Sequence, residues 1–375
     1  MFVKTIYTIK DVFGFRSPVK DNLTHINEAV KWLCRAQDAT PDGGVSHSYA
    51  VGKGWAPSYP ETTGYIIPTL LNVSEYMEDV SLRERALQMA DWELEVQLES
   101  GAIPALSSEN PVVFDTGQVI FGWLAAYNSV RDNKYIKAAL KAGDWLLSVM
   151  DDDGVWRRYG NPGSDNQHTY NVRTAWALIA LANLSGKAKY ADGVAGFMDW
   201  VLDQEEKESG WFHHNCLNEN LRPLLHTIAY TSQGLLESGI SLKDERFINA
   251  AARTSDALMQ HVDEQGRMPG RFNQSWNPAA KWSCLTGMAQ TSIVWQKLDL
   301  ISGNHKYSEA SAKVNNFLKS TQAINADNVG IRGGIRGSYP ISGEYGKYRT
   351  LNWATKFFID ALLLNEFPNV SLSLY

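Results

Sequence analysis

The sequence predicts an all-α fold in which six helical hairpins close into an (α/α)6 toroid. Three observations carry this prediction: a helix-loop-helix unit that recurs six times, a glycine in every loop at nearly even spacing, and an alternation of charged-faced helices with apolar ones. A repeat of this length is typical of architectures in which each unit buries its apolar face against the next. The 375 residues fit two domains or one large closed architecture, and the repeat favours the second.

The first helix of each unit is amphipathic and ends in a short signature built around an aromatic or aliphatic residue. The six copies contain Trp32, Trp92, Trp145, Trp200, Leu258 and Phe317. A glycine-containing loop follows each copy, with Gly44, Gly101, Gly154, Gly210, Gly266 and Gly330 spaced 53 to 64 residues apart. Since glycine adopts the left-handed conformation that stops a helix, these loops mark the ends of the first helices.

The second helix of each unit is more apolar and rich in small residues. We expect these helices to begin near Thr62, Asp115, Thr169, Thr227, Thr286 and Asn352, with threonine and aspartate side chains capping the first N–H groups. A helix that is apolar on most sides must be buried, so the second helices form the inner layer and the first helices the outer layer. The long loops that enter the inner helices then form the mouth of a funnel, where function is expected.

The domain organisation that follows is simple. Residues 1–22 precede the first repeat and are expected to be an N-terminal extension packed on the barrel, and residues 23–367 form a single toroid domain.

Charge, hydropathy and cysteine content exclude several classes of function. The net charge of −6, without a Lys/Arg run, argues against nucleic acid as a partner. No apolar stretch approaches the ~20 residues that cross a bilayer, so membrane insertion is not expected. Three widely spaced cysteines do not suggest a disulfide framework, and the N-terminus has no apolar leader, which predicts a cytoplasmic protein.

Aromatic residues are abundant in the predicted loops. The chain has thirteen tryptophans and sixteen tyrosines. The apolar face of a sugar ring packs on an aromatic side chain while its hydroxyls bond to polar neighbours. The candidate sugar platforms are Trp55, Trp156, Trp211, Trp276, Trp282 and Trp353. The alternative is ordinary packing of loops over a large protein.

Five stretches of the chain, 55–65, 115–118, 168–171, 225–230 and 282–287, resemble the VpsJ-like polysaccharide-biosynthesis proteins, and the resemblance covers nearly the whole sequence. It implies a link to bacterial exopolysaccharide or cell-surface glycans. It also implies the six-hairpin glycosidase-like group, which includes glycoside hydrolases, polysaccharide lyases and sugar epimerases. The expected partner is therefore an oligosaccharide or polysaccharide substrate.

Glu61 is the first candidate for catalysis, because it lies in an aromatic-rich loop immediately before an inner helix, next to Tyr59. The positive end of the helix dipole favours an anion there, which suits a base or a nucleophile. Asp115 begins the next inner helix, beside Gln118, and Asp165 in the third loop is a reserve acid. Two carboxylates on neighbouring walls can flank a glycosidic bond as acid and base. The alternative is that both residues only cap helices.

The third and fourth inner helices carry a different set of polar residues. His168, Tyr170, Asn171 and Arg173 stand close together, and His226 and Tyr230 lie one turn apart on the next inner helix. Abstraction of a proton next to a uronate carboxylate needs such groups, as in a lyase or a C5-epimerase. The alternative is hydrogen bonding to substrate without proton transfer, or a structural role for the histidines.

Arg336 stands among glycines in the sixth loop and suits recognition of a carboxylate, so an anionic sugar is one expectation. No metal or other cofactor is expected, because the cysteines and histidines lack the partner motifs of a zinc site.

Taken together, the sequence favours a carbohydrate-active enzyme, most simply a glycoside hydrolase that uses Glu61 with Asp115 or Asp165. A uronate lyase or epimerase and a non-catalytic glycan-binding subunit of a polysaccharide-assembly complex remain open alternatives.

Overall fold

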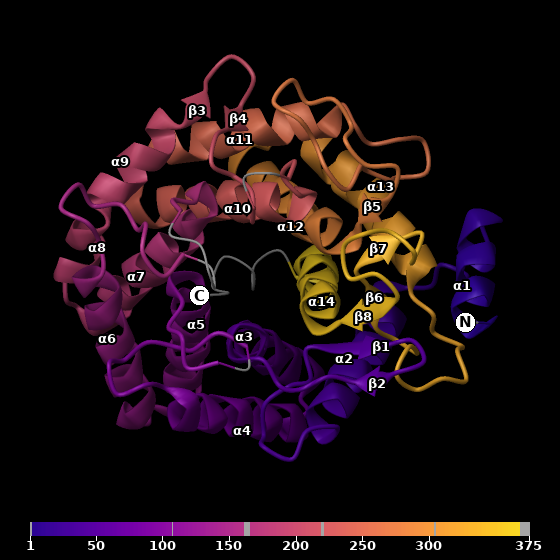
Figure 1. Ribbon diagram of the computed structural model, residues 1–375, viewed down its shortest axis with the longest axis horizontal. Coiled ribbons are helices and arrows are strands. Elements are labelled where there is room, and N and C mark those ends of the chain that lie inside the picture. Colours follow the sequence, from indigo (N-terminus) through magenta and orange to yellow (C-terminus); the bar gives the residue numbers. More distant parts are fainter. Residues whose placement is uncertain (1, 107, 161–165, 219–220, 304, 368–375) are drawn as a thin grey trace.

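The computed structural model describes residues 2–106, 108–160, 166–218, 221–303 and 305–367, and it confirms the predicted toroid (Figure 1). The inner ring consists of α3 (Pro60–Met77), α5 (Val113–Val130), α7 (Val172–Ser185), α10 (Leu225–Leu242), α12 (Leu285–Ser302) and α14 (Asn352–Glu366). The outer ring consists of α2 (Asn22–Asp38), α4 (Val80–Val96), α6 (Asn133–Ser148), α8 (Lys189–Gly193) with α9 (Ala195–Asp203), α11 (Glu245–Met259) and α13 (Lys306–Thr321).

Close packing of the inner helices closes the ring. Each inner helix contacts the next, and α14 returns to pack on α3. A Cβ atom at Gly64 of α3 would lie 2.7 Å from Cα of Val119, and one at Gly287 of α12 would lie 2.6 Å from the backbone N of His226. The glycines of the inner helices therefore serve the close crossing of neighbours.

Side-chain caps were expected at the starts of the inner helices, but the structure shows them at the starts of outer helices. Aspartates cap four outer helices, where Asp21, Asp79, Asp132 and Asp244 accept a backbone N–H. The inner helices have no such side-chain cap.

The threonines near the inner helix starts have a different role, because they lie inside the first turns. The hydroxyl of Thr63 accepts the N–H of Val45 at 3.0 Å, and that of Thr116 accepts the N–H of Ile103 at 2.9 Å. These threonines therefore fasten the preceding loop to the inner helix.

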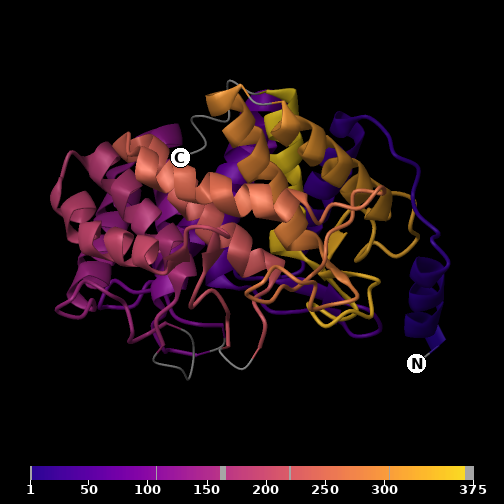
Figure 2. The same cartoon turned by 90° about the horizontal axis from the view of Figure 1, so that it is seen from above.

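Short strands tie the loops together at one face of the toroid, where Figure 2 shows them gathered. A four-stranded sheet has the order β2 (Gly54–Trp55), β1 (Ser48–Ala50), β8 (Arg349–Leu351), β6 (Ile335–Arg336). Because β1 pairs antiparallel with β8, with Tyr49 opposite Thr350, the sheet joins the first loop to the last. Two further pairs are β3 (Glu205–Glu206) with β4 (Trp211–Phe212), and β5 (Ser283–Cys284) with β7 (Ser338–Tyr339).

Helix α1 (Phe2–Val12) lies at the edge of the toroid and is fixed by a buried ion pair (Figures 1 and 2). Both carboxylate oxygens of Asp11 accept from Arg336 Nη1 at 2.7 Å, and one also accepts the N–H of Ile341 at 2.7 Å. The Tyr339 hydroxyl donates to the Asp11 carbonyl at 2.9 Å. Arg336 was expected to bind substrate in the funnel. Its side chain instead joins the sixth loop to α1 through Asp11.

In the described part of the chain no helix combines the length and the apolar character that crossing a membrane requires. Cys34, Cys216 and Cys284 form no disulfide.

We predict that Asp11→Asn lowers the free energy of unfolding by about 3–5 kcal/mol in urea denaturation, because it leaves the buried Arg336 charge without its partner. The control is Asp199→Asn, whose ion pair with Arg246 is exposed on both sides, and it should cost about 0–1 kcal/mol. Equal losses in the two variants would contradict this account of α1.

Candidate functional site

A pocket of about 250 Å³ opens at the N-terminal ends of the inner helices, on the face where the loops gather. Its walls are Tyr59, Glu61, Thr62, Tyr65, Phe114, Asp115, Tyr170, Leu217, His226, Tyr230, Tyr345 and Trp353. Helices α3, α5, α10 and α14 supply most of these side chains, because their first turns converge on the toroid axis. The pocket is therefore mainly aromatic, with two carboxyl groups and one histidine.

Glu61 and Asp115 share the hydroxyl of Tyr59. Glu61 is in the first turn of α3 and Asp115 in the first turn of α5. Tyr59 Oη lies 3.0 Å from Asp115 Oδ2, and the Tyr59 hydroxyl also lowers the pKa of Glu61, as a hydrogen-bond donor to that carboxyl does. A phenol has one proton to donate, so it can bond to both carboxyl groups only when one of them is protonated and donates to it. The geometry thus matches a pair that holds a single proton.

Burial acts in the same direction on both carboxyl groups. It raises the pKa of Glu61 from 4.5 to about 7, although the Tyr59 hydrogen bond and the Arg173 charge both lower it. Burial also raises the pKa of Asp115 well above its ordinary range, and the negative charge of Glu61 raises it further. Desolvation therefore outweighs the helix dipole that favoured an anion at Glu61. With a pKa of about 7, Glu61 is partly ionised at neutral pH, and burial together with the Glu61 charge favours the protonated form of Asp115.

A third carboxyl group, Glu93 on α4, was not anticipated from the sequence. It is fully buried, and neither of its oxygens has a hydrogen-bond partner among the described residues. Burial and then the charge of Asp115 raise the pKa of Glu93 well above 4.5, which favours the neutral form of this carboxyl. Glu93 lies on an outer helix, where the sequence analysis did not look for site residues.

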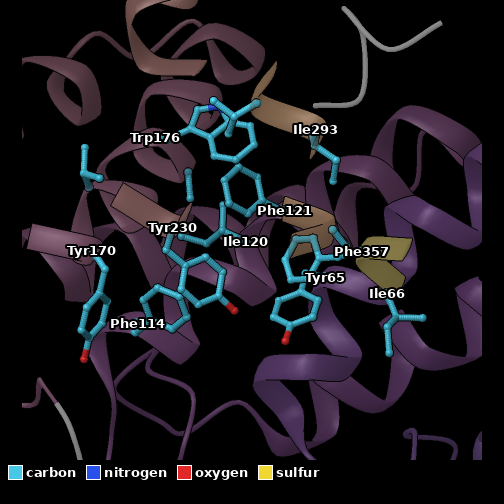
Figure 3. Close-up of a cluster of buried hydrophobic side chains, with 14 of the residues drawn as sticks. Tyr65, Ile66, Phe114, Ile120, Phe121, Tyr170, Trp176, Tyr230, Ile293 and Phe357 are labelled. Atoms are coloured by element: carbon cyan, nitrogen blue, oxygen red, sulfur yellow. The ribbon is translucent and has the colours of Figure 1, made fainter. Parts of the chain in front are cut away.

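Aromatic rings form the pocket floor and walls (Figure 3). Phe114 lies 4.9 Å from Tyr230 and 5.4 Å from Tyr170, measured between ring centroids. Tyr65 packs against Phe357 at 5.5 Å. The Tyr230 hydroxyl is buried and has no hydrogen-bond partner among the described residues, which leaves a polar group in the pocket wall available to a ligand.

His226 is a neutral acceptor in the pocket. Its Nδ1 lies 2.6 Å from Oε1 of Gln290, and because an amide oxygen only accepts, Nδ1 carries the proton. Burial lowers the pKa of His226 to about 4. Nε2 therefore keeps its lone pair at neutral pH.

Tyr345 and Trp353 close the pocket on the side of the last repeat. The indole N–H of Trp353 donates to the Tyr345 hydroxyl at 2.8 Å, and the Tyr345 ring lies 5.4 Å from that of His226. Trp353 was a predicted platform, whereas Tyr345, Tyr65 and Phe114 were missed. For Tyr65 and Phe114 a signal existed, since both lie in the first two turns of inner helices.

Arg173 and Gln118, predicted to bind substrate, lie beneath the pocket and do not line it. Arg173 has no exposed surface, and its Nε donates to Gln118 Oε1 at 2.5 Å. Both side chains are therefore separated from the pocket by its aromatic floor.

The proposed lyase set is brought together only in part, since Tyr170, His226 and Tyr230 line the pocket and the other members do not. Tyr170 lines the pocket, but His168 stacks behind it at 4.7 Å and does not. Burial lowers the pKa of His168 to about 4. Asn171 is fully buried outside the pocket lining, and Asp165 lies outside the described residues.

Most of the predicted tryptophan platforms lie elsewhere. Trp156 has no exposed surface and donates to the Leu146 carbonyl, so it belongs to the core. Trp211 and Trp276 are buried against each other at 5.1 Å. Trp55 packs on Trp32 and Tyr49, and Trp282 lies beside Arg271. Sequence position alone did not distinguish these packed loop residues from Trp353.

Within the described ranges, no group of three His, Cys, Asp or Glu side chains is placed to hold a metal ion.

Comparison with protein-family models and with curated protein sequences gives no match. Solved structures do match. An unsaturated glucuronyl hydrolase from a Bacillus species, described as responsible for the degradation of glycosaminoglycan, superposes with a TM-score of 0.76 at 17% identity over 94% of this chain and 98% of its own. Cellobiose 2-epimerase from Bacillus thermoamylovorans gives 0.74 at 9% identity over 98% and 100%. A D-mannose isomerase gives 0.70 at 11% identity over 92% and 97%. These similarities establish the six-hairpin toroid.

The raised pKa of Glu61 leads to a prediction about stability. Ionising a carboxyl whose pKa is higher in the folded protein destabilises that state, so the wild-type protein loses stability as the pH rises from 4.5 to about 7. Glu61→Gln lacks this loss. We therefore expect the difference in free energy of unfolding, variant minus wild type, to increase over this interval and to level off above it. Urea denaturation across pH measures this difference, and one that is constant with pH would contradict the assignment.

Proposed function

We propose that the protein is a carbohydrate-active enzyme that hydrolyses a glycosidic bond in a bacterial surface glycan or exopolysaccharide, with Asp115 as general acid and Glu61 as general base. The observation that carries this proposal is the carboxyl pair joined by the Tyr59 hydroxyl in an aromatic pocket. Two carboxyl groups with different protonation states are what glycoside hydrolysis requires.

Each carboxyl group transfers a proton in the proposed hydrolysis. Asp115, which keeps its proton, donates it to the oxygen of the leaving sugar as the glycosidic bond breaks. Glu61, which ionises, accepts a proton from the attacking water. Tyr59 bonds to both groups and keeps them oriented toward the same point in the pocket.

The size of the pocket supports action at a chain end. Its volume of about 250 Å³ is at the small end of the range for ligand pockets, which suits a single sugar ring. The rings of Tyr65, Tyr230 and Trp353 give that sugar apolar faces to pack on. We therefore propose removal of a terminal residue.

A basic group beside the pocket supports an anionic sugar. Arg349 donates to the Ser48 hydroxyl at 3.0 Å and, among the described residues, has no carboxylate within ion-pair distance. Burial and then the Arg349 charge lower the pKa of His47 to about 4. The His47 ring stacks on that of Trp353, with 6.3 Å between the ring centroids. A carboxylate on the substrate could bind to Arg349 at this edge.

The biological setting is proposed on two grounds. The resemblance to VpsJ-like proteins links the chain to polysaccharide biosynthesis, and similar structures include enzymes named for glucuronyl, cellobiose and mannose substrates. A cytoplasmic location fits three cysteines that form no disulfide.

Sugar epimerisation or isomerisation is the second candidate, and His226 favours it. A neutral imidazole with a free Nε2 lone pair is suited to abstract a proton from a sugar carbon. In that reaction solvent deuterium enters the sugar and no reducing end is released. Under this alternative His226→Asn, rather than Glu61→Gln, abolishes turnover.

We predict that Glu61→Gln and Asp115→Asn each lower kcat/KM by at least about 100-fold, because each removes one proton-transfer group. Release of reducing ends from bacterial exopolysaccharide fragments, neutral and uronate-containing, is the assay. Glu309→Gln, an exposed change on α13, is the matched control and should retain full activity. Wild-type turnover that survives both substitutions would refute the hydrolase proposal.

We also predict that Tyr230→Phe keeps the wild-type free energy of unfolding within about 0.5 kcal/mol, because the hydroxyl has no hydrogen-bond partner among the described residues. Its kcat/KM should fall by about 10-fold through the lost hydrogen bond to the sugar. Unchanged kinetics would show that the hydroxyl does not contact substrate.

A further inference from the structure

Arg173 carries a buried charge that, in the part of the chain the structure describes, no carboxylate neutralises by direct contact. The side chain has no exposed surface. Nε donates to Gln118 Oε1 at 2.5 Å and Nη1 to Gln233 Oε1 at 2.7 Å, while Nη2 has no hydrogen-bond partner among the described residues. Burying a cation without a paired anion costs free energy. We therefore expect the buried charge of Arg173 to have a function.

The groups around Arg173 stabilise a cation without cancelling its field. Four rings surround the guanidinium carbon, at 5.1 Å for Trp176, 5.3 Å for Tyr230, and 5.5 Å for Phe121 and Phe357. Figure 3 shows these rings gathered between the inner helices. Ring faces and amide oxygens attract a cation but carry no net charge. The positive potential therefore extends through Tyr230 to the pocket.

The acids that face this charge are Glu61 on α3 and Asp115 on α5, with Glu93 on α4 beyond Asp115. Arg173 lowers the pKa of Glu61, and it is the one cation among the described residues that acts on this carboxyl. Burial and then the Glu61 charge favour the protonated form of Asp115. Glu61 is therefore the carboxyl group whose negative charge the Arg173 cation balances.

Of the other titratable groups near the pocket, Arg349 is a cation at the edge, and those on α10 and α14 add no net charge. On α10, burial keeps His226 neutral, with a pKa of about 4. On α14, Lys356 and Asp360 neutralise each other at 2.5 Å. The phenols that face the pair, Tyr59, Tyr65, Tyr230 and Tyr345, all have raised pKa values because they are buried.

We propose that Arg173 is a positioning residue, the counter-charge of the Glu61–Asp115 pair, which holds the pair at one proton and one negative charge without touching the substrate. Its catalytic meaning rests on the proposed function, since it decides which carboxyl is the base. The charge itself is a property of the free protein. Arg173 is thus reassigned from the predicted substrate contact to a support beneath the pocket.

The test is a pH titration of the Glu61 carboxyl carbon by NMR in protein labelled with ¹³C at glutamate Cδ, with the resonance assigned by its loss in Glu61→Gln. Arg173→Met removes the charge and keeps an apolar side chain among the rings. We expect the Glu61 midpoint to rise by about one pH unit. Arg173→Lys, which keeps the charge, should restore the midpoint to within about half a unit.

The control is the double variant Glu237→Gln/Lys297→Met, which removes a buried ion pair from the opposite end of the inner ring. It should leave the Glu61 midpoint unchanged. An unchanged midpoint in folded Arg173→Met would overturn the proposal. If this variant is unfolded at about pH 8.5, it is examined at about pH 5, where Glu61 is protonated and needs no counter-charge. Folding at the lower pH supports the proposal, and failure to fold at both contradicts it.

These outcomes are separate from those of the hydrolase assay. A shifted midpoint in a protein that cleaves no glycan removes the proposed function and keeps the counter-charge. Glycan cleavage together with an unshifted Glu61 midpoint keeps the proposed function and removes the counter-charge.

Discussion

Two buried carboxyl groups bonded to one phenol cannot both be charged at little cost, and this constraint organises the site. Tyr59 can satisfy Glu61 and Asp115 together only when the pair holds one proton. Burial supplies the energetic reason, because it raises the pKa of both carboxyl groups and the charge of one disfavours ionisation of the other. The single negative charge that remains is matched by the single cation of Arg173 below the pocket floor. A pair built in this way has one position that favours the proton and one that favours the charge in the free protein.

The toroid makes this arrangement possible by directing the first turns of its inner helices to one place. Glycines allow the inner helices to cross closely, and the sheet formed by β1 and β8 joins the first loop to the last. The Asp11–Arg336 pair holds the sixth loop, whose continuation brings Tyr345 to the pocket. Residues far apart in the chain therefore meet in one pocket of about 250 Å³ because the ring is closed.

The repeat predicted the architecture because its signal is periodic and is read six times over. The inner helix starts were accurate to within a few residues, and the expectation that loops before inner helices form the site brought out the lining residues Tyr59, Glu61, Asp115, Tyr170, His226, Tyr230 and Trp353. Side-chain direction was not predictable in the same way. Arg173 and Tyr170 are three residues apart, yet one points beneath the pocket and the other lines it. The sequence also could not show that Arg336 has a buried partner in α1, or that a loop tryptophan such as Trp156 turns into the core.

The protonation state of the pair is the claim on which the account depends, and neutron diffraction from deuterium-exchanged crystals at about pH 8.5, above the Glu61 pKa of about 7, observes it directly. We expect deuterium on Asp115 and on the Tyr59 hydroxyl, none on Glu61, and a fully deuterated Arg173 guanidinium beneath them. Deuterium on both carboxyl groups, or on neither, would contradict the account.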